Sequence, residues 1–129
     1  MQDADFSDDF CRFLQTSIAS VDAAEVLLYL RRNAAAWHSA RDVSAGLRPS
    51  SSVSEADAEK HIEALRVREI VAVDAEKRAQ YQPASDGLRQ HADNLAAAYR
   101  ERPVTLIRVI YALRDSKIKT FADAFRIKG

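Results

Sequence analysis

Cysteine, glycine and proline are scarce in this 129-residue sequence. Cys11 is the only cysteine, so an internal disulfide is excluded, and on an expected helix it is typical of a small packed side chain. Three glycines and three prolines leave few positions that would interrupt a helix. Because 47% of the residues are hydrophobic and 29% are charged, the composition favours one helix-rich globular domain over residues 1–129 and argues against disorder.

Signals for secretion and for membrane insertion are also missing. The sequence does not open on a basic segment followed by an apolar one, and no apolar run reaches the length of about 18 residues that a membrane-spanning helix needs. We therefore expect a cytoplasmic protein that does not insert into a membrane.

The motifs of common catalytic centres do not occur. The sequence has no glycine-rich phosphate loop, no nucleophile elbow and no Cys-x-x-Cys or His-x-x-x-His pair. His38, His61 and His91 fall on a connector and on two different expected helices, without the spacing of metal ligands. We therefore expect no cofactor, no metal ion and no enzymatic activity.

The formal net charge is zero, but the charges are unevenly distributed. Residues 1–65 carry six Lys or Arg and eleven Asp or Glu, whereas residues 66–129 carry the other thirteen and eight. Such a division can place an acidic and a basic face on one domain, which favours self-association or a polar partner over uniform contact with a polyanion. A solvated surface with uneven charge is an equally good interpretation.

Helical periodicity dominates what the sequence does contain. Apolar residues recur at three- and four-residue steps, and serines precede four of these segments in the position of a helix N-cap. Pro103 fits the first turn of a further helix, where its missing amide would have no partner. The expected helices cover residues 7–19, 21–32, 40 to about 46, a segment that begins after Ser54, 86 to about 101, and a segment that begins at Pro103.

The stretch 54–83 organises the expected fold. One face of its helix carries Ala58, Ile62 and Leu65, so this face should be buried. Residues 70–73 and 79–83 then have the composition of two short strands, joined by a polar turn at 74–78. Upstream of the stretch, Trp37 is expected in the core, in a connector that can hold a short first strand.

The order of three helices and two strands between Val21 and Pro83 resembles the winged helix-turn-helix domain of transcription regulators and covers about half of the chain. The ending, with Arg100-Glu101-Arg102-Pro103 and then Phe121-Ala122-Asp123-Ala124-Phe125-Arg126-Ile127-Lys128, is similar to small uncharacterised bacterial proteins of winged-helix type. The resemblance implies a mainly α fold with a small β-wing. In it, residues 20–83 form the winged-helix core, residues 7–19 an added N-terminal helix and residues 85–129 a C-terminal helical extension.

In such regulators the outward face of the third helix enters the major groove of DNA and the wing touches phosphate or the minor groove. The residues that DNA binding would use here are Lys60, Lys77 and Arg78. However, the outward face of this helix holds Glu63 as well as Lys60 and is flanked by Glu59, and residues 55–65 carry four carboxylates and one lysine in all. This charge opposes entry into a DNA groove. We therefore expect a non-enzymatic regulatory module, transcription-associated by resemblance, that acts mainly through protein–protein contacts. The alternative is a DNA-binding transcriptional regulator that contacts DNA through the wing.

Aromatic and aliphatic residues also gather outside the expected winged core. A three-helix core has few free faces to cover them, so together they would form a larger apolar patch than soluble monomers usually expose. We therefore expect a homodimer, or contact with another protein, through the N-terminal helix and the C-terminal segment. The expected interface residues are Phe6, Phe10, Phe13, Leu106, Ile107, Val109, Ile110, Tyr111, Phe121 and Phe125.

Overall fold

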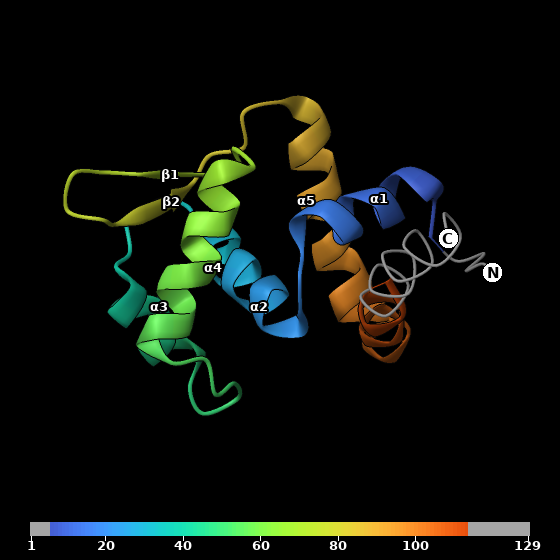
Figure 1. Ribbon diagram of the computed structural model, residues 1–129, viewed down its shortest axis with the longest axis horizontal. Coiled ribbons are helices and arrows are strands. Elements are labelled where there is room, and N and C mark those ends of the chain that lie inside the picture. Colours follow the sequence, from blue (N-terminus) through green and yellow to red (C-terminus); the bar gives the residue numbers. More distant parts are fainter. Residues whose placement is uncertain (1–5, 114–129) are drawn as a thin grey trace, which may run out of the picture.

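The computed structural model describes residues 6–113 and is mainly helical, with one small antiparallel sheet (Figure 1). This confirms the expected mainly α composition with a short pair of strands. The elements are α1 (Asp8–Ser17), α2 (Val21–Arg32), α3 (Ala40–Leu47), α4 (Glu55–Val67), β1 (Val71–Val73), β2 (Ala79–Tyr81), α5 (Asp86–Glu101) and a C-terminal helix described over Pro103–Leu113.

A serine begins each of the helices α1 to α5. In every case its hydroxyl accepts a hydrogen bond from the backbone amide three residues later, at 3.0–3.1 Å. The bond satisfies one of the free amides of the first turn, and such a cap is worth about 1 kcal/mol. Four of these caps, Ser20, Ser39, Ser54 and Ser85, are predicted from the sequence, and the structure confirms them.

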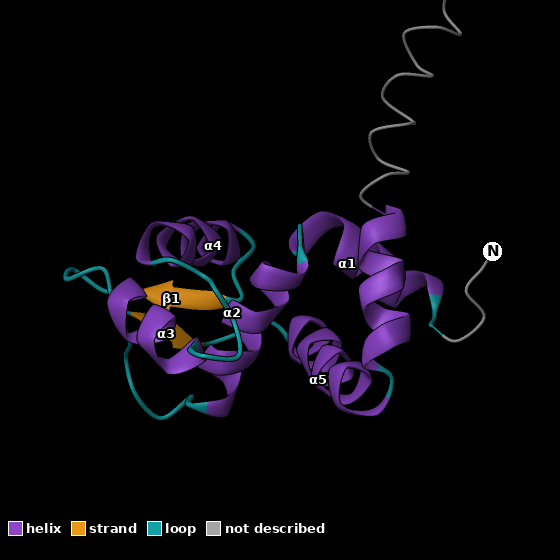
Figure 2. Cartoon of the chain, turned by 90° about the horizontal axis from the view of Figure 1, so that it is seen from below, coloured by secondary structure: helices purple, strands orange, loops and turns teal. Residues whose placement is uncertain are grey.

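Helix α2 lies at the centre of the fold, between α3, α4 and the sheet on one side and α5 on the other (Figures 1 and 2). Ala24, Leu27 and Leu28, which share one face of the helix, are buried. Val26 and Leu30 are fully buried as well. The helix is therefore covered around most of its circumference, as the central helix of a core should be.

Helices α1 and α5 and the C-terminal helix form the other end of the molecule (Figure 2). The ring of Phe13 stacks on His91 of α5 with the ring centroids 5.0 Å apart. Within residues 6–113 no single helix is both long and apolar enough to cross a membrane; α1 and α2 reach that length only together, and they meet at 99°.

This arrangement corrects the expectation for several interface residues. Phe10 and Phe13 of α1, and Leu106 and Ile110 of the C-terminal helix, are at most 5% exposed within the single chain. Val109 is buried with them. Helix α5 ends with its C-cap Arg102, and the apolar C-terminal helix that follows runs across α5 and contributes to the same core (Figure 2). These residues are therefore core residues and are not available to a partner.

Trp37 is also placed differently from the prediction. It is 36% exposed, whereas the neighbouring His38 is half-buried with its ring edge-on to Tyr29. The backbone of His38 forms two hydrogen bonds with Ala79, at 2.9 and 2.7 Å, so the expected short first strand is reduced to a single bridge. Since successive side chains in extended backbone point to opposite sides, an inward His38 turns Trp37 outward.

The sheet is a two-stranded hairpin. Val71 pairs with Tyr81, Ala72 with Gln80 and Val73 with Ala79, and Val71 and Ala79 bury their side chains against the helices. Both strands are one to two residues shorter than predicted: Ile70 is missing from the start of β1, and Gln82 and Pro83 from the end of β2, although the amide of Gln82 still donates to the carbonyl of Ile70 at 3.1 Å.

Two polar contacts fasten α5 to α2. The guanidinium of Arg31 donates two hydrogen bonds to Asp93, at 3.1 and 2.9 Å. Six residues after Asp93 on α5, the hydroxyl of Tyr99 donates a hydrogen bond to the carboxylate of Glu25 on α2. Burial and then the Glu25 carboxylate raise the pKa of the Tyr99 hydroxyl to about 12.

This shift makes the stability sensitive to alkaline pH. Because the pKa of Tyr99 in the folded protein lies above the ordinary tyrosine value of 10.0, its contribution to stability is complete below pH 10 and is lost as the pH rises towards about 12. We expect the thermal midpoint of wild type to fall over this interval, measured by circular dichroism in steps of pH. Tyr99→Phe should flatten the fall only partly, because burial also raises the pKa of Tyr81.

Tyr111→Phe is the matched control, since it removes the hydroxyl of an exposed tyrosine. Its profile should follow that of wild type. A Tyr99→Phe profile that also follows wild type would show that the bond to Glu25 does not contribute to stability.

Candidate binding groove between α3, α4 and the hairpin

A groove of about 450 Å³ lies where the start of α3, the outward face of α4 and the hairpin converge. Its volume falls within the range of about 300–1,000 Å³ that is usual for ligand-binding clefts. The lining residues are Ser39, Ala40 and Arg41 of α3 and its cap, Glu55, Glu59, Ile62 and Glu63 of α4, and Val73, Glu76 and Lys77 of the hairpin. They are called the groove residues below.

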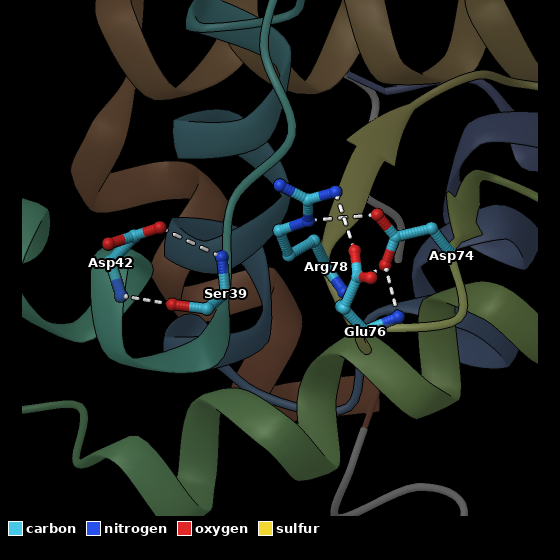
Figure 3. A network of polar contacts seen from close by, with 5 residues as sticks. All are labelled: Ser39, Asp42, Asp74, Glu76 and Arg78. Atoms are coloured by element: carbon cyan, nitrogen blue, oxygen red, sulfur yellow. Dashed lines mark hydrogen bonds and ion pairs between the residues drawn. The ribbon is translucent and has the colours of Figure 1, made fainter.

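Local hydrogen bonds fix the α3 wall of the groove. The hydroxyl of Ser39 accepts from the amide of Asp42, and the carboxylate of Asp42 accepts from the amide of Ser39, both at 3.0 Å (Figure 3). The amide of Ser39 lowers the pKa of the Asp42 carboxyl below its ordinary value. The adjoining bridge between His38 and Ala79 holds the start of α3 beside β2.

Two further contacts hold α3 against its neighbours. The buried hydroxyl of Ser44 donates to the carbonyl of Val53 at 2.8 Å, which links α3 to the segment that leads into α4. Gly46 lets α3 approach α2 closely, because a Cβ at this position would overlap the ring of Tyr29.

Carboxylates dominate the α4 wall. Glu55, Glu59 and Glu63 are spaced four residues apart, so they form an exposed stripe along one side of the helix. The outward face predicted from the sequence is thereby confirmed for Glu59 and Glu63, and also for Lys60. Glu63 accepts two hydrogen bonds from Arg66, and these lower the pKa of its carboxyl.

The floor of the groove is apolar. Ile62 of α4 is 5% exposed, and Val73 at the end of β1 is half-buried. Arg41 and Lys77 are the cations of the lining. The groove therefore combines an apolar floor with walls on which glutamates outnumber basic residues.

Arg78, one of the expected DNA contacts, is held by its own turn (Figure 3). Its guanidinium donates to Asp74 at 2.9 Å and to Glu76 at 2.8 Å. The second oxygen of Asp74 accepts from the amides of Glu76 and Arg78 at 3.0 and 2.8 Å. The amide of Arg78 is the main cause of a lowered pKa at the Asp74 carboxyl. Arg78 therefore stabilises the turn, and a phosphate would have to compete with two carboxylates for it.

Lys77 and Lys60, the other expected DNA contacts, are exposed. Lys77 has a φ of 64°, in the left-handed region that residues other than glycine, asparagine and aspartate seldom adopt. It is the last residue of the turn 74–77, and its amide donates to the carbonyl of Asp74 at 3.0 Å. It forms no ion pair with any residue of the described range 6–113. Lys77 lines the groove, whereas Lys60 points from α4 outside the lining.

The three histidines take separate positions. His38 bridges to β2, His91 stacks on Phe13, and His61 is half-buried on α4, where burial lowers its pKa. Among residues 6–113, no three His, Cys, Asp or Glu side chains lie close enough to hold a metal ion.

Sequence reasoning missed the groove as a whole. It assigned Lys77 to the wing and Glu59 and Glu63 to an outward face, but not Arg41, Glu55 or Glu76 to a common site. The N-cap pattern predicted where α3 and α4 begin. Nothing in that pattern shows that the two starts and the hairpin turn come together.

Part of the expected interface remains accessible. Phe6 is half-buried, with its ring edge-on to Phe10 and with the guanidinium of Arg102 4.9 Å above it. On the C-terminal helix, Val104 and Tyr111 are 68% and 52% exposed, and Ile107 is partly exposed between them. The expected contacts at Phe121 and Phe125 lie outside the described residues.

The groove offers an apolar floor and charged walls to a ligand, and its lining does not contain the paired nucleophile and base of a hydrolytic centre. No protein-family model, no curated protein and no solved structure matches this chain.

Proposed function

We propose that this protein is a non-enzymatic regulatory module with a winged helix-turn-helix core, and that it works mainly through protein contacts at the groove. The core would comprise α2, α3 and α4 with the hairpin as the wing, and α1, α5 and the C-terminal helix would be additions to it. The order of these elements and the bridge from His38 to β2 support this assignment. The association with transcription rests on the resemblance of the sequence to winged-helix regulators.

One observation carries the choice of protein over DNA. In a winged-helix regulator, the third helix and the wing face the nucleic acid, and here these two elements form the walls of the groove. The stripe of Glu55, Glu59 and Glu63 would face a DNA backbone that carries one negative charge per about 1.7 Å. The nearby Arg78 is already bound to two carboxylates. Repulsion therefore opposes docking of DNA on this face.

The same face suits a basic protein segment. Carboxylates on the walls would attract lysine or arginine, and the floor at Ile62 and Val73 can bury an apolar side chain of the partner. Charge complementarity gives such an interface its selectivity and association rate, and apolar burial gives it affinity. A partner that combines both features is therefore favoured.

Titration of fluorescent DNA duplexes tests the proposal. We expect wild type to show no saturable binding at physiological salt, to random or to genomic sequences. Glu59→Gln with Glu63→Gln should raise the weak affinity at low salt by roughly three- to tenfold, because two repelling charges disappear and Arg66 is released. The measurement is fluorescence anisotropy at two salt concentrations.

Glu69→Gln with Glu101→Gln is the matched control, since it removes the same charge from exposed positions outside the groove. It should change the low-salt affinity much less. Saturable, sequence-dependent binding by wild type at physiological salt would contradict the proposal. If Lys77→Ala with Arg78→Ala then weakened that binding on all sequences alike, DNA contact through the wing would be the function instead.

The homodimer expected from the sequence stays a prediction. With Phe10, Phe13, Leu106 and Ile110 in the core, the apolar face left for it consists of Val104, Ile107 and Tyr111. A face of three residues is small beside the roughly 800 Å² that each partner buries in a stable interface. Other surfaces must therefore contribute if two copies associate.

A further inference from the structure

We propose that the groove binds the C-terminal segment, residues 114–129, of a second copy of this chain. The inference rests on the proposed role of the groove in protein binding, and it names the occupant. If two copies exchange their segments reciprocally, the contact closes into a two-fold dimer.

Charge complementarity supports this occupant. Glu63 and Glu76 are paired with Arg66 and Arg78, but Glu55 and Glu59 form no ion pair with any described residue. The α4 wall therefore keeps two uncompensated carboxylates, while Arg41 of α3 and Lys77 of the hairpin also line the groove without an ion pair to a described residue. The segment 114–129 carries five Lys or Arg and two Asp, so its charge is opposite to that of the wall.

The apolar residues of the segment match the floor of the groove. Ile118 lies between Lys117 and Lys119 and Ile127 between Arg126 and Lys128, whereas Phe121 and Phe125 lie on either side of Asp123. A cleft of about 450 Å³ above Ile62 and Val73 has room for an aromatic side chain. The basic residue nearest to that aromatic, Lys119 before Phe121 or Arg126 after Phe125, would then face Glu55 and Glu59.

The position of the groove favours a second copy over the segment's own chain. The groove and the C-terminal helix lie at opposite ends of the longest axis of the molecule (Figure 1). Phe121 follows Leu113 by eight residues, which span roughly 27 Å at full extension. A compact chain of this length is about 36 Å across. Phe121 would therefore not reach the groove of its own chain, and Phe125, twelve residues after Leu113, could span roughly 40 Å and would reach it only with the segment almost fully extended.

The uneven distribution of charge agrees with such an exchange. The groove draws most of its residues from the acidic first half of the sequence, whereas the segment ends the basic second half. Contact between the groove of one copy and the segment of the other would neutralise the charge of both. Segment exchange therefore accounts for the uneven distribution of charge along the sequence, which DNA binding through the wing does not require.

A charge-reversal pair in the full-length protein tests the inference. The groove variant carries Glu55→Lys and Glu59→Lys, and the segment variant carries Lys117→Glu and Lys119→Glu. Each variant alone has like charges on groove and segment, so its self-association should be at least tenfold weaker than that of wild type. In an equimolar mixture each segment meets a groove of opposite charge, so association should return to within about threefold of wild type. The measurement is sedimentation or light scattering over a dilution series, with circular dichroism to verify folding.

Arg89→Glu with Arg100→Glu reverses two exposed charges on α5 and should leave association unchanged. If wild type stays at the monomer mass of 14.4 kDa at high micromolar concentration, the inference is overturned. A segment that binds the groove of its own chain would give this same monomeric result. Self-association that both variants retain would overturn it too, and would place the contact on the exposed face of the C-terminal helix. If the two variants are folded but their mixture remains monomeric, the inference is likewise overturned.

The DNA titration separates this inference from the proposed function. Rescue in the mixture together with tight DNA binding by wild type would support segment exchange and contradict the protein-binding role. If the mixture is not rescued and wild type does not bind DNA, segment exchange is contradicted and the protein-binding role is supported. The groove would then bind a different basic partner.

Discussion

Ile110→Asp is expected to remove most of the stability of the protein. Ile110 is 3% exposed and packs in the core with the residues of α1 and α5, so the substitution deletes a buried aliphatic side chain and adds a carboxylate without a partner. Loss of the packed side chain alone typically costs about 2–5 kcal/mol, and the unpaired polar group adds to it. Since domains of this kind are stable by about 5–15 kcal/mol, we expect a weakly folded or unfolded variant. Urea denaturation followed by circular dichroism measures the change.

Tyr111→Asp is the control for this prediction. Tyr111 follows Ile110 directly on the same helix but is 52% exposed, so its substitution should change the free energy of unfolding by about 0.5–1 kcal/mol or less. If Ile110→Asp were well folded and only its self-association were lost, Ile110 would belong to an interface, as the sequence pattern suggested. Equal destabilisation by both variants would show that the helix is buried on both sides.

The difference between these two neighbours explains where sequence reasoning succeeds. Periodicity and N-caps are local, and they placed the starts of α2 to α5 and the buried face of α4 correctly. Periodicity shows that Phe10 and Leu106 need a cover but not what covers them. That depends on the break between α5 and the C-terminal helix at Arg102, which lets the C-terminal helix join the same core. The apolar surplus for which the sequence pattern predicts a second chain is therefore largely covered within one.

The candidate site shows the same limit in its polar residues. Asp74 and Glu76 can be seen in the sequence beside Lys77 and Arg78, as carboxylates that dilute the basic turn. That both accept from one guanidinium depends on the tight turn, in which Lys77 takes a left-handed conformation. The availability of a basic side chain for phosphate is thus a property of the folded turn, because charge counts do not record which cations are already paired.

Ser44→Ala is expected to destabilise the protein by about 1–3 kcal/mol, because it leaves the buried carbonyl of Val53 without the hydrogen bond that it accepts at 2.8 Å. At about 4 °C per kcal/mol, the thermal midpoint should fall by roughly 4–12 °C.

The control is Ser50→Ala. The hydroxyl of Ser50 also donates to a backbone carbonyl, that of Leu47 at 3.0 Å, but Ser50 is exposed and water can replace the bond. The midpoint should therefore change by less than about 2 °C. The contrast between the two serines isolates the effect of burial, because each substitution deletes a hydroxyl that donates to a backbone carbonyl, within α3 at Ser44 and just beyond α3 at Ser50. Similar midpoints for both variants would show that the link between α3 and the segment before α4 does not depend on this bond, and that the packing of Val43, Leu47 and Val53 alone holds the α3 wall of the groove in place.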